Sequence, residues 1–340
     1  MDFILDYAGF LLRAVTVVMV VAIILAFAAS AKGRGRSKEG SLHVKSLNEF
    51  YGDLKQQLQA ELLDKKQFKA VNKQEADKAK HAKKQKTEQS RVFVLDFAGD
   101  IKASAADSLR HEVTALLSMA KKDDEVVLRL ESTGGMVHSY GFAASQLARI
   151  RQAGIPLTIC VDKVAASGGY MMACLGDKIL SAPFAILGSV GVVAQLPNIH
   201  RLLKKHDIDV EILTAGEYKR TLTVLGENTE QGRKKFLEDL QTTHDLFKEF
   251  VVGYRPQLDI NKVATGEIWL GTDALKLELV DQLQTSDEYL SKRAQESKVY
   301  ALEYAFRKSM QERIGLAALL TTDSFLLRWW ERLLQQRFWR

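Results

Sequence analysis

The chain has 340 residues, of which 46% are hydrophobic and 26% charged, a composition typical of a folded globular protein. Its net charge of +6 lies within residues 1–90, where 16 Lys and Arg stand against 10 Asp and Glu, and the remainder is balanced. A balanced body gives no reason to expect a nucleic-acid partner. Cys160 and Cys174 lie in apolar surroundings without a CxxC pair or a Cys/His cluster, which predicts two core thiols and no metal site.

Residues 9–31 form an apolar stretch, GFLLRAVTVVMVVAIILAFAASA, which is long enough to cross a bilayer as one helix. A short flank, residues 1–8, precedes it. A secretory signal peptide is the alternative, but the apolar run is longer than a signal h-region and no lysine precedes it. We therefore predict a single-pass membrane anchor in contact with lipid. The basic residues that follow favour a cytoplasmic location for the rest of the chain: Lys32, Arg34, Arg36 and Lys38.

Residues 32–90 have the pattern of a basic helical arm. One part carries apolar residues at spacings of three and four, which predicts a helix with one apolar stripe facing a partner. The lysine-rich part, Lys65 to Lys86, fits either contact with an anionic surface or a solvated linker, and the solvated linker is favoured. The apolar stripe comprises Leu47, Phe50, Leu54, Leu58 and Leu62.

Residues 91–290 alternate strand-like and helix-like patterns, which predicts an α/β fold with a mostly parallel sheet covered on both faces. Residues 228–254 predict one long helix, and residues 264–283 a tight turn and a short helix. The predicted strands are 92–97, 126–131, 157–162, 178–182, 186–194 and 210–215, and the shorter predicted helices are 104–120, 139–153, 168–175 and 197–206.

The C-terminal segment, residues 291–340, ends in LLRWWERLLQQRFWR. This pattern predicts an amphipathic helix with tryptophans on one side and arginines on the other. Such a helix suits a membrane interface and equally suits docking on a neighbouring subunit. The residues leave both interpretations open.

Two glycine-rich turns are the places where backbone amides become available for chemistry. In ESTGGMVHSYG, Gly134 and Gly135 follow a predicted strand, so their N–H groups are free to point at an anion. In VDKVAASGGYMMACLGD, Ser167 stands at the start of a predicted helix between small residues. A serine there is often only a helix cap. Its open hydroxyl beside the Gly168 amide also fits a nucleophile.

A nucleophilic serine needs a base, and none of the seven histidines lies in a triad-like context. A desolvated lysine is the alternative base. TAGEYKRTLTVLGENT contains Lys219, but a lysine in a loop is ordinarily a surface residue. The residues alone do not select it.

Four motifs in order, ESTGGMVHSYG, DKVAASGGYMMAC, SAPFAILGSVGVV and AGEYKRTLTVLGENTE, resemble the signal peptide peptidase A family, most closely its short membrane-anchored SohB branch. The resemblance covers residues from about 90 to 290. It implies Ser167 as nucleophile, Lys219 as general base, Ser189 as the residue that orients the lysine, and the N–H groups of Gly135 and Gly168 as oxyanion donors. The expected fold is the crotonase/Clp-protease-like ββα superhelix, and no cofactor is expected.

The resemblance further implies a serine endopeptidase with a Ser-Lys dyad that cleaves extended polypeptides such as signal-peptide remnants. Because double-length relatives build each site from two domain copies, we expect a ring-shaped homo-oligomer in which Ser167 and Lys219 of one chain do not touch. The expected location is the plasma (inner) membrane, and the relatives favour an extracytoplasmic catalytic domain. One position departs from the family pattern: Thr133 stands where proline is usual.

Two other functions fit parts of the sequence. A crotonase-type acyl-CoA enzyme shares the expected fold and an oxyanion hole of backbone amides but does not need Ser167. A non-catalytic membrane scaffold would instead use the apolar arm, the lysine-rich stretch and the Trp-rich tail.

Overall fold

The computed structural model describes Thr16, residues 40–73 and residues 90–306. Three sequence predictions therefore lie outside the described residues: the apolar segment 9–31 apart from Thr16, most of the lysine-rich stretch, and the Trp-rich helix. Within the residues that are described, no helix is both long and apolar enough to cross a membrane.

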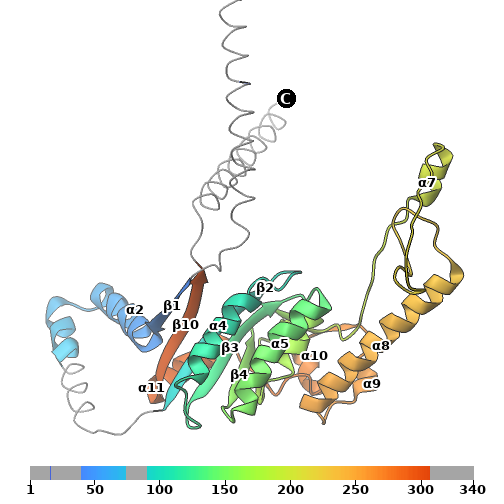
Figure 1. Ribbon diagram of the computed structural model, residues 1–340. Coiled ribbons are helices and arrows are strands. Elements are labelled where there is room, and N and C mark those ends of the chain that lie inside the picture. Colours follow the sequence, from blue (N-terminus) through green and yellow to red (C-terminus); the bar gives the residue numbers. More distant parts are fainter. Residues whose placement is uncertain (1–15, 17–39, 74–89, 307–340) are drawn as a thin grey trace, which may run out of the picture. The chain divides into compact units, whose positions relative to one another are not determined.

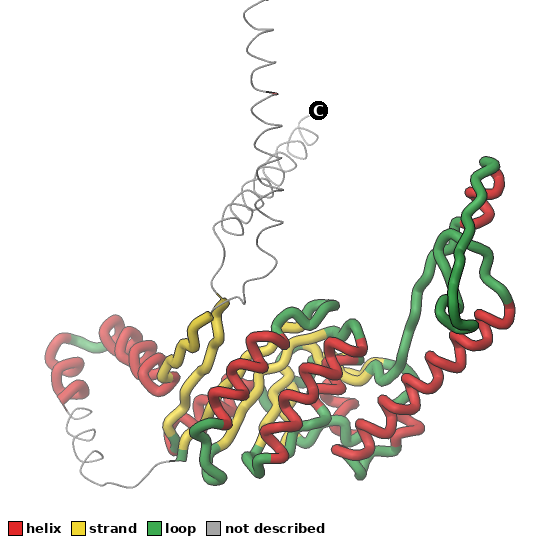
Figure 2. The backbone as a smooth tube through the Cα atoms, in the orientation of Figure 1, coloured by secondary structure: helices red, strands yellow, loops and turns green. Residues whose placement is uncertain are grey.

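The described chain has a mixed α/β fold built on one large sheet (Figures 1 and 2). Its strands run in the order β1-β10-β2-β3-β4-β6-β9, and neighbouring strands from β10 to β9 pair in parallel. Parallel strands need helical crossovers, which place helices on the faces of the sheet. The strands are β1 (Gly40–Ser46), β2 (Arg91–Gly99), β3 (Glu125–Ser132), β4 (Leu157–Val161), β6 (Lys178–Ser181), β9 (Gln282–Leu283) and β10 (Lys298–Phe306).

Three short strands branch from the end of β3. Strand β5 (Val164–Ala166) pairs with β3 at Ser132 and in parallel with β7 (Ile186–Gly188). Strand β8 (Ile268–Leu270) pairs with β7 and runs antiparallel to it. This branch carries the turns that follow β5 and β7, and these turns form the site described below.

Helices cover both faces of the sheet. On one face, α4 (Ala106–Leu117), α5 (Val137–Gln152) and α6 (Gly168–Ala173) pack on the larger apolar core, as Figure 1 shows for α4 and α5. On the other face, α2 (Leu47–Leu62) and α11 (Ser286–Glu296) adjoin a smaller cluster that contains Val94, Val127 and Leu290. The remaining helices are α7 (His200–Lys205), α8 (Glu230–Tyr254), α9 (Ile260–Val263) and α10 (Gly271–Lys276).

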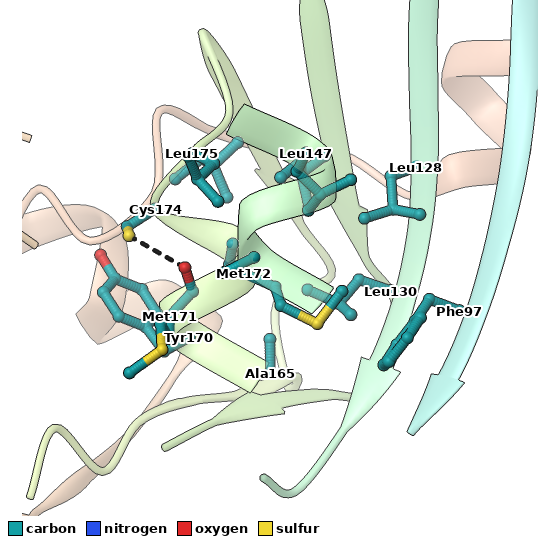
Figure 3. Close-up of a cluster of buried hydrophobic side chains, with 14 of the residues drawn as sticks. Phe97, Leu128, Leu130, Leu147, Ala165, Tyr170, Met171, Met172, Cys174 and Leu175 are labelled. Carbon is teal, nitrogen blue, oxygen red and sulfur yellow. Dashed lines mark hydrogen bonds between the residues drawn. The ribbon is translucent and has the colours of Figure 1, made fainter. Parts of the chain in front are cut away.

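Helix α6 is buried along its whole length, which fixes its first residue in the core. Figure 3 shows its side chains among Leu130, Leu147 and Ala165. The predicted core thiols are confirmed: Cys160 and Cys174 are free and buried, and burial raises the pKa of each to about 12. Both thiols are therefore protonated at neutral pH and act as small apolar residues.

Helix α8 is fixed to the body at its C-terminal end. Phe247 and Val251 are buried in the larger core. The residue after the helix, Arg255, is 3% exposed and pairs with Asp281 at 2.9 Å. The same carboxylate accepts the amide of Ile179 at 2.7 Å, so the ion pair connects α8 to strand β6. At its N-terminal end, the helix is capped by its own Thr229, whose hydroxyl accepts the Gly232 amide.

One predicted strand is too long, and another is wrong. The run 186–194 leaves the strand after Gly188, because Ser189 has a φ of 51° and donates its amide to the Glu267 carbonyl at 2.6 Å. Residues 210–215 form no strand in the described chain and are largely exposed. A β-prone run becomes a strand only where its side chains can pack against those of a neighbouring strand, and this run has no such neighbour among the described residues. The prediction for 264–283 missed the short strands β8 and β9, and β1 and β10 were not predicted either.

One buried carboxyl makes the stability of this fold depend on pH. Glu112 is 4% exposed; one of its oxygens accepts the Tyr304 amide at 2.8 Å, and the other has no partner. Burial raises the pKa of Glu112 from 4.5 to about 7. Between these two values the folded protein holds a proton that the unfolded chain has lost. The free energy of unfolding therefore falls as pH rises through this window.

We predict that Glu112→Gln, which mimics the protonated carboxyl, removes this pH dependence. The wild-type free energy of unfolding should fall by about 3 kcal/mol relative to the variant between pH 4.5 and 8. Urea unfolding of both proteins across this range measures the difference. Parallel pH curves would contradict the assignment.

Candidate active site

Ser167 lies at a strained turn between β5 and α6. Its φ of 52° and ψ of −119° are unfavourable for a residue with a side chain. Its amide donates to the Gly188 carbonyl at 2.8 Å, which holds the turn in place. The half-buried side chain makes no capping hydrogen bond to α6, so the helix-cap interpretation is wrong. A strained turn from strand to helix with an uncommitted hydroxyl is the arrangement in which serine nucleophiles are presented.

A second turn, Thr133 to Gly135, lies against the first. Gly134 has a φ of 87°, and a Cβ added there would lie 2.8 Å from the Ser167 Cβ. Gly135 has no room for a side chain, because a Cβ would collide with the Ile101 carbonyl. No backbone acceptor for the Gly135 amide occurs among residues 40–73 and 90–306. The first amide of α6, that of Gly168, precedes the intrahelical hydrogen bonds. Two amides suited to an oxyanion therefore adjoin Ser167.

A buried hydroxyl network holds the glycine turn. Tyr140 is fully buried on α5 and donates its hydroxyl to the Asp100 carbonyl at 2.8 Å. Because its one proton is used there, Tyr140 accepts from the Ser132 hydroxyl at 2.5 Å. The Ser132 oxygen in turn accepts the Gly134 amide at 3.0 Å. Burial raises the pKa of Tyr140, so it remains a protonated donor at neutral pH. The Tyr140 ring also occupies the space that a Cβ on Gly168 would need.

Ser167, Gly135 and Gly168 line a pocket of about 830 Å³, a size that fits a peptide side chain with adjoining backbone. Ser189 lines the same pocket and is held at a second left-handed position, with its amide donating to the Glu267 carbonyl. Most of the wall is apolar and comes from α5, α6 and α8. The apolar contributors include Val137, Met171, Leu246, Phe247 and Phe250.

Lys219 does not line this pocket and is exposed. It lies in residues 191–229, which leave the body after β7 and return at the start of α8 (Figure 1). We call this segment the arm; it is distinct from the N-terminal basic segment, residues 32–90. Near Lys219, Glu217 accepts a hydrogen bond from Gln231 of α8 at 2.9 Å. From Gln231 to the pocket residue Phe247 the helix rises about 24 Å, since each helical residue adds about 1.5 Å. The Lys219 side chain makes no hydrogen bond to Ser167 among the described residues.

Hydrogen bonds within the arm join the segment just before α7 to the loop that precedes α8. The Asn198 amide group donates to the carbonyls of Thr223 and Gly226, both at 2.9 Å. The Asn228 side chain accepts the Thr223 amide at 2.8 Å. The loop that carries Lys219 therefore has a defined shape within one chain, although most of its side chains face solvent.

Of the five predicted site residues, the structure brings together Ser167, Ser189, Gly135 and Gly168, and leaves Lys219 outside. Sequence reasoning missed Ser132 and Tyr140, which position the glycine turn. Both stand in the motif ESTGGMVHSYG, three residues before and five after Gly135, but only the fold shows that their hydroxyls meet. No group of three or more His, Cys, Asp and Glu residues suited to a metal ion is found among the residues described.

Comparison with known proteins shows the family to which the chain belongs. Residues 2–147 match the model of the peptidase family S49 N-terminal region, and residues 149–300 match that of peptidase family S49. The chain therefore belongs to peptidase family S49 and is a peptidase, which sets aside the acyl-CoA enzyme and the non-catalytic scaffold.

Its relatives include proteins of similar length. The chain is 49% identical to Probable protease SohB of Haemophilus influenzae, with 93% of each chain covered. It is 45% identical to Probable protease SohB of Buchnera aphidicola subsp. Acyrthosiphon pisum, with 96% of this chain and 98% of the relative covered. It is also 24% identical to Protease 4 of Haemophilus influenzae, matching only 33% of that longer protein. The predicted resemblance to the signal peptide peptidase A family and its SohB branch is confirmed.

The hydroxyl network predicts different effects for two buried tyrosines. Tyr140→Phe removes the hydroxyl that supports the Gly134 turn, and Tyr170→Phe removes one that donates to the Leu279 carbonyl. Tyr140→Phe leaves the buried Ser132 hydroxyl without its acceptor, and Tyr170→Phe leaves the buried Leu279 carbonyl without this donor. Each change should therefore lower the free energy of unfolding by about 1–3 kcal/mol. Only Tyr140→Phe should also lower peptidase kcat, by roughly tenfold, because a displaced oxyanion donor weakens transition-state stabilisation. Equal kcat values for the two variants would contradict the positioning role of Tyr140.

Proposed function

We propose that this peptidase is a serine endopeptidase in which Ser167 is the nucleophile and Lys219 the general base. The observation that carries the proposal is the strained Ser167 turn, whose uncommitted hydroxyl opens on the pocket beside the amides of Gly135 and Gly168. Strain of this kind costs about 1–3 kcal/mol and persists only where the surroundings enforce it. A purely structural serine has no need of it.

In the proposed reaction, neutral Lys219 takes the proton of Ser167 as the hydroxyl oxygen attacks a peptide carbonyl. The amides of Gly135 and Gly168 donate to the developing oxyanion, and each such donor is worth roughly 10²–10³ in rate. The protonated lysine gives its proton to the leaving amine, and an acyl-enzyme remains on Ser167. Water, deprotonated by Lys219, then attacks the acyl carbonyl, and Lys219 returns the proton to the departing Ser167 oxygen. No metal or nucleotide takes part.

We assign the lysine of each site to a neighbouring copy of the chain. A lysine acts as a base at neutral pH when its pKa is lowered, which desolvation does. Within one chain, however, Lys219 is exposed and does not line the pocket. Burial of the arm against a second copy supplies that desolvation. Ser189, which already lines the pocket, is then placed to accept a hydrogen bond from the incoming amine and orient it. A closed ring of copies completes every site.

The remaining parts of the proposal come from the sequence. Residues 9–31 anchor the chain in the inner membrane as one span and contact lipid. The catalytic body has the crotonase/Clp-protease-like superhelical fold. Its substrates are extended polypeptides such as signal-peptide remnants, which suit the apolar pocket wall. The basic residues after the span favour a cytoplasmic body, and the family relationship favours the outer side.

Labelling with a fluorophosphonate tests the nucleophile and the base together. We expect the wild-type protein to be labelled and to cleave an unstructured peptide, and Ser167→Ala to lose both properties. Lys219→Ala should lower kcat by about 10⁴-fold, because the remaining amides and binding contacts still assist. Lys234→Ala, which removes a nearby lysine from α8, is the control and should keep wild-type activity. Cleavage by Ser167→Ala at the wild-type rate would exclude the proposal.

A further inference from the structure

An exposed apolar face lies beside the proposed active site. Phe184 is 81% exposed at the turn between β6 and β7. Strands β7 and β8 form a two-stranded ribbon in which Ile186 is paired directly with Leu270. Ile268 lies two residues before Leu270, so all three side chains share one side of the ribbon. Each of the three is exposed. We call these four residues the ribbon face: Phe184, Ile186, Ile268 and Leu270.

The ribbon face is held rigidly. The opposite side of the ribbon carries Leu187, which is fully buried, and Trp269, which packs against the larger core. The turn with Phe184 is fixed by Thr272 of α10, whose amide donates to the Pro183 carbonyl at 3.1 Å. Several exposed apolar side chains grouped on a fixed backbone are typical of a surface that a partner covers.

The ribbon is continuous with the site. Strand β7 leads directly into Ser189, which lines the pocket. Thr265 and Gly266 also line the pocket, and one residue, Glu267, separates them from the start of β8. The amide of Ser189 donates to Glu267 across the ribbon. Whatever covers the ribbon face therefore lies next to the mouth of the pocket that contains Ser167.

The arm has matching exposed apolar residues. Leu213 is 89% exposed, and its neighbour Ile212 lies against Gly226 but is still 41% exposed. Leu202 and Ile208 are also exposed. These side chains belong to the same element as Lys219, which the proposed function delivers to the pocket of another chain. Burying both apolar surfaces in one contact would remove them from water together.

We propose that the ribbon face is the surface on which the arm of a second copy docks, so that contact with Leu213 guides Lys219 into the pocket. This inference rests on the proposed function, since it names the surface that receives the lysine. It makes the contact directional: the arm of one copy meets the ribbon face of the next. Such head-to-tail contacts form a ring when the rotation between successive copies closes.

Mixed oligomers test this direction. Chains with Ser167→Ala and chains with Lys219→Ala, co-expressed with different tags and purified through both, are each inactive alone. In a random ring, about one quarter of the sites combine an intact Ser167 with an intact Lys219, which restores about one quarter of wild-type peptidase activity.

Ile268→Lys is then added to only one of the two chains. On the Lys219→Ala chain, which supplies Ser167, it should lower the restored activity at least about tenfold, because a charge replaces an apolar contact. On the Ser167→Ala chain, whose own pocket is inactive, activity should stay within about twofold. Met119→Lys is the control, because Met119 is 58% exposed, as Ile268 is, but lies outside the ribbon face. It should have no effect on either chain.

The outcomes separate the two proposals. Equal losses from both placements of Ile268→Lys, or no loss from either, would overturn docking on the ribbon face while leaving the shared dyad intact. If the wild type is active but the two inactive chains never restore activity, the shared dyad itself fails, and the docking proposal fails with it.

Discussion

The amide of Ser167 donates to the carbonyl of Gly188 at 2.8 Å, and the arrangement of the site depends on this bond. It joins the turn after β5 to the end of β7 and keeps Ser167 at a positive φ. Buried α6 then continues from the same turn, so the serine hydroxyl is directed by the sheet on one side and by the core on the other. Gly134 and Gly168 are packed so closely beside this turn that neither has room for a side chain, and Ser189 lines the same pocket.

Under the proposed function, the contrast between the body and the arm explains how one fold can hold most of a site without completing it. The body is fixed by buried groups such as the Tyr140 hydroxyl and the Arg255–Asp281 ion pair, and it forms the pocket that Ser167 and two glycine amides line. The side-chain hydrogen bonds described for the arm join it to itself and to the N-terminal half of α8, and the arm carries Lys219 in solvent. A base kept in water until assembly would leave the isolated chain inactive. This fits a peptidase whose activity depends on its oligomeric state.

Sequence patterns predicted those parts of the molecule in which local preference and burial agree. The parallel strands β2, β3, β4 and β6 were predicted, because their apolar residues are also core residues. The long helix α8 was predicted from its helical pattern, although only its Phe247 and Val251 are buried. The strand over 210–215 was wrong because its β-prone residues have no partner to pair with. Ser167 was plausible from its small neighbours, whereas Lys219 came only from the family motifs. Tyr140 and Ser132 were missed because their role depends on a contact between β3 and α5.

A structure of the assembled oligomer tests the central claim most directly, through the distance from the Lys219 Nζ to the nearest Ser167 Oγ. The account predicts that this distance lies within hydrogen-bonding range, about 2.6–3.2 Å, and joins two different chains. It also predicts that the arm lies against the ribbon face of the chain that supplies the serine. An assembly in which every Lys219 remains in solvent while a different base contacts Ser167 would contradict the account.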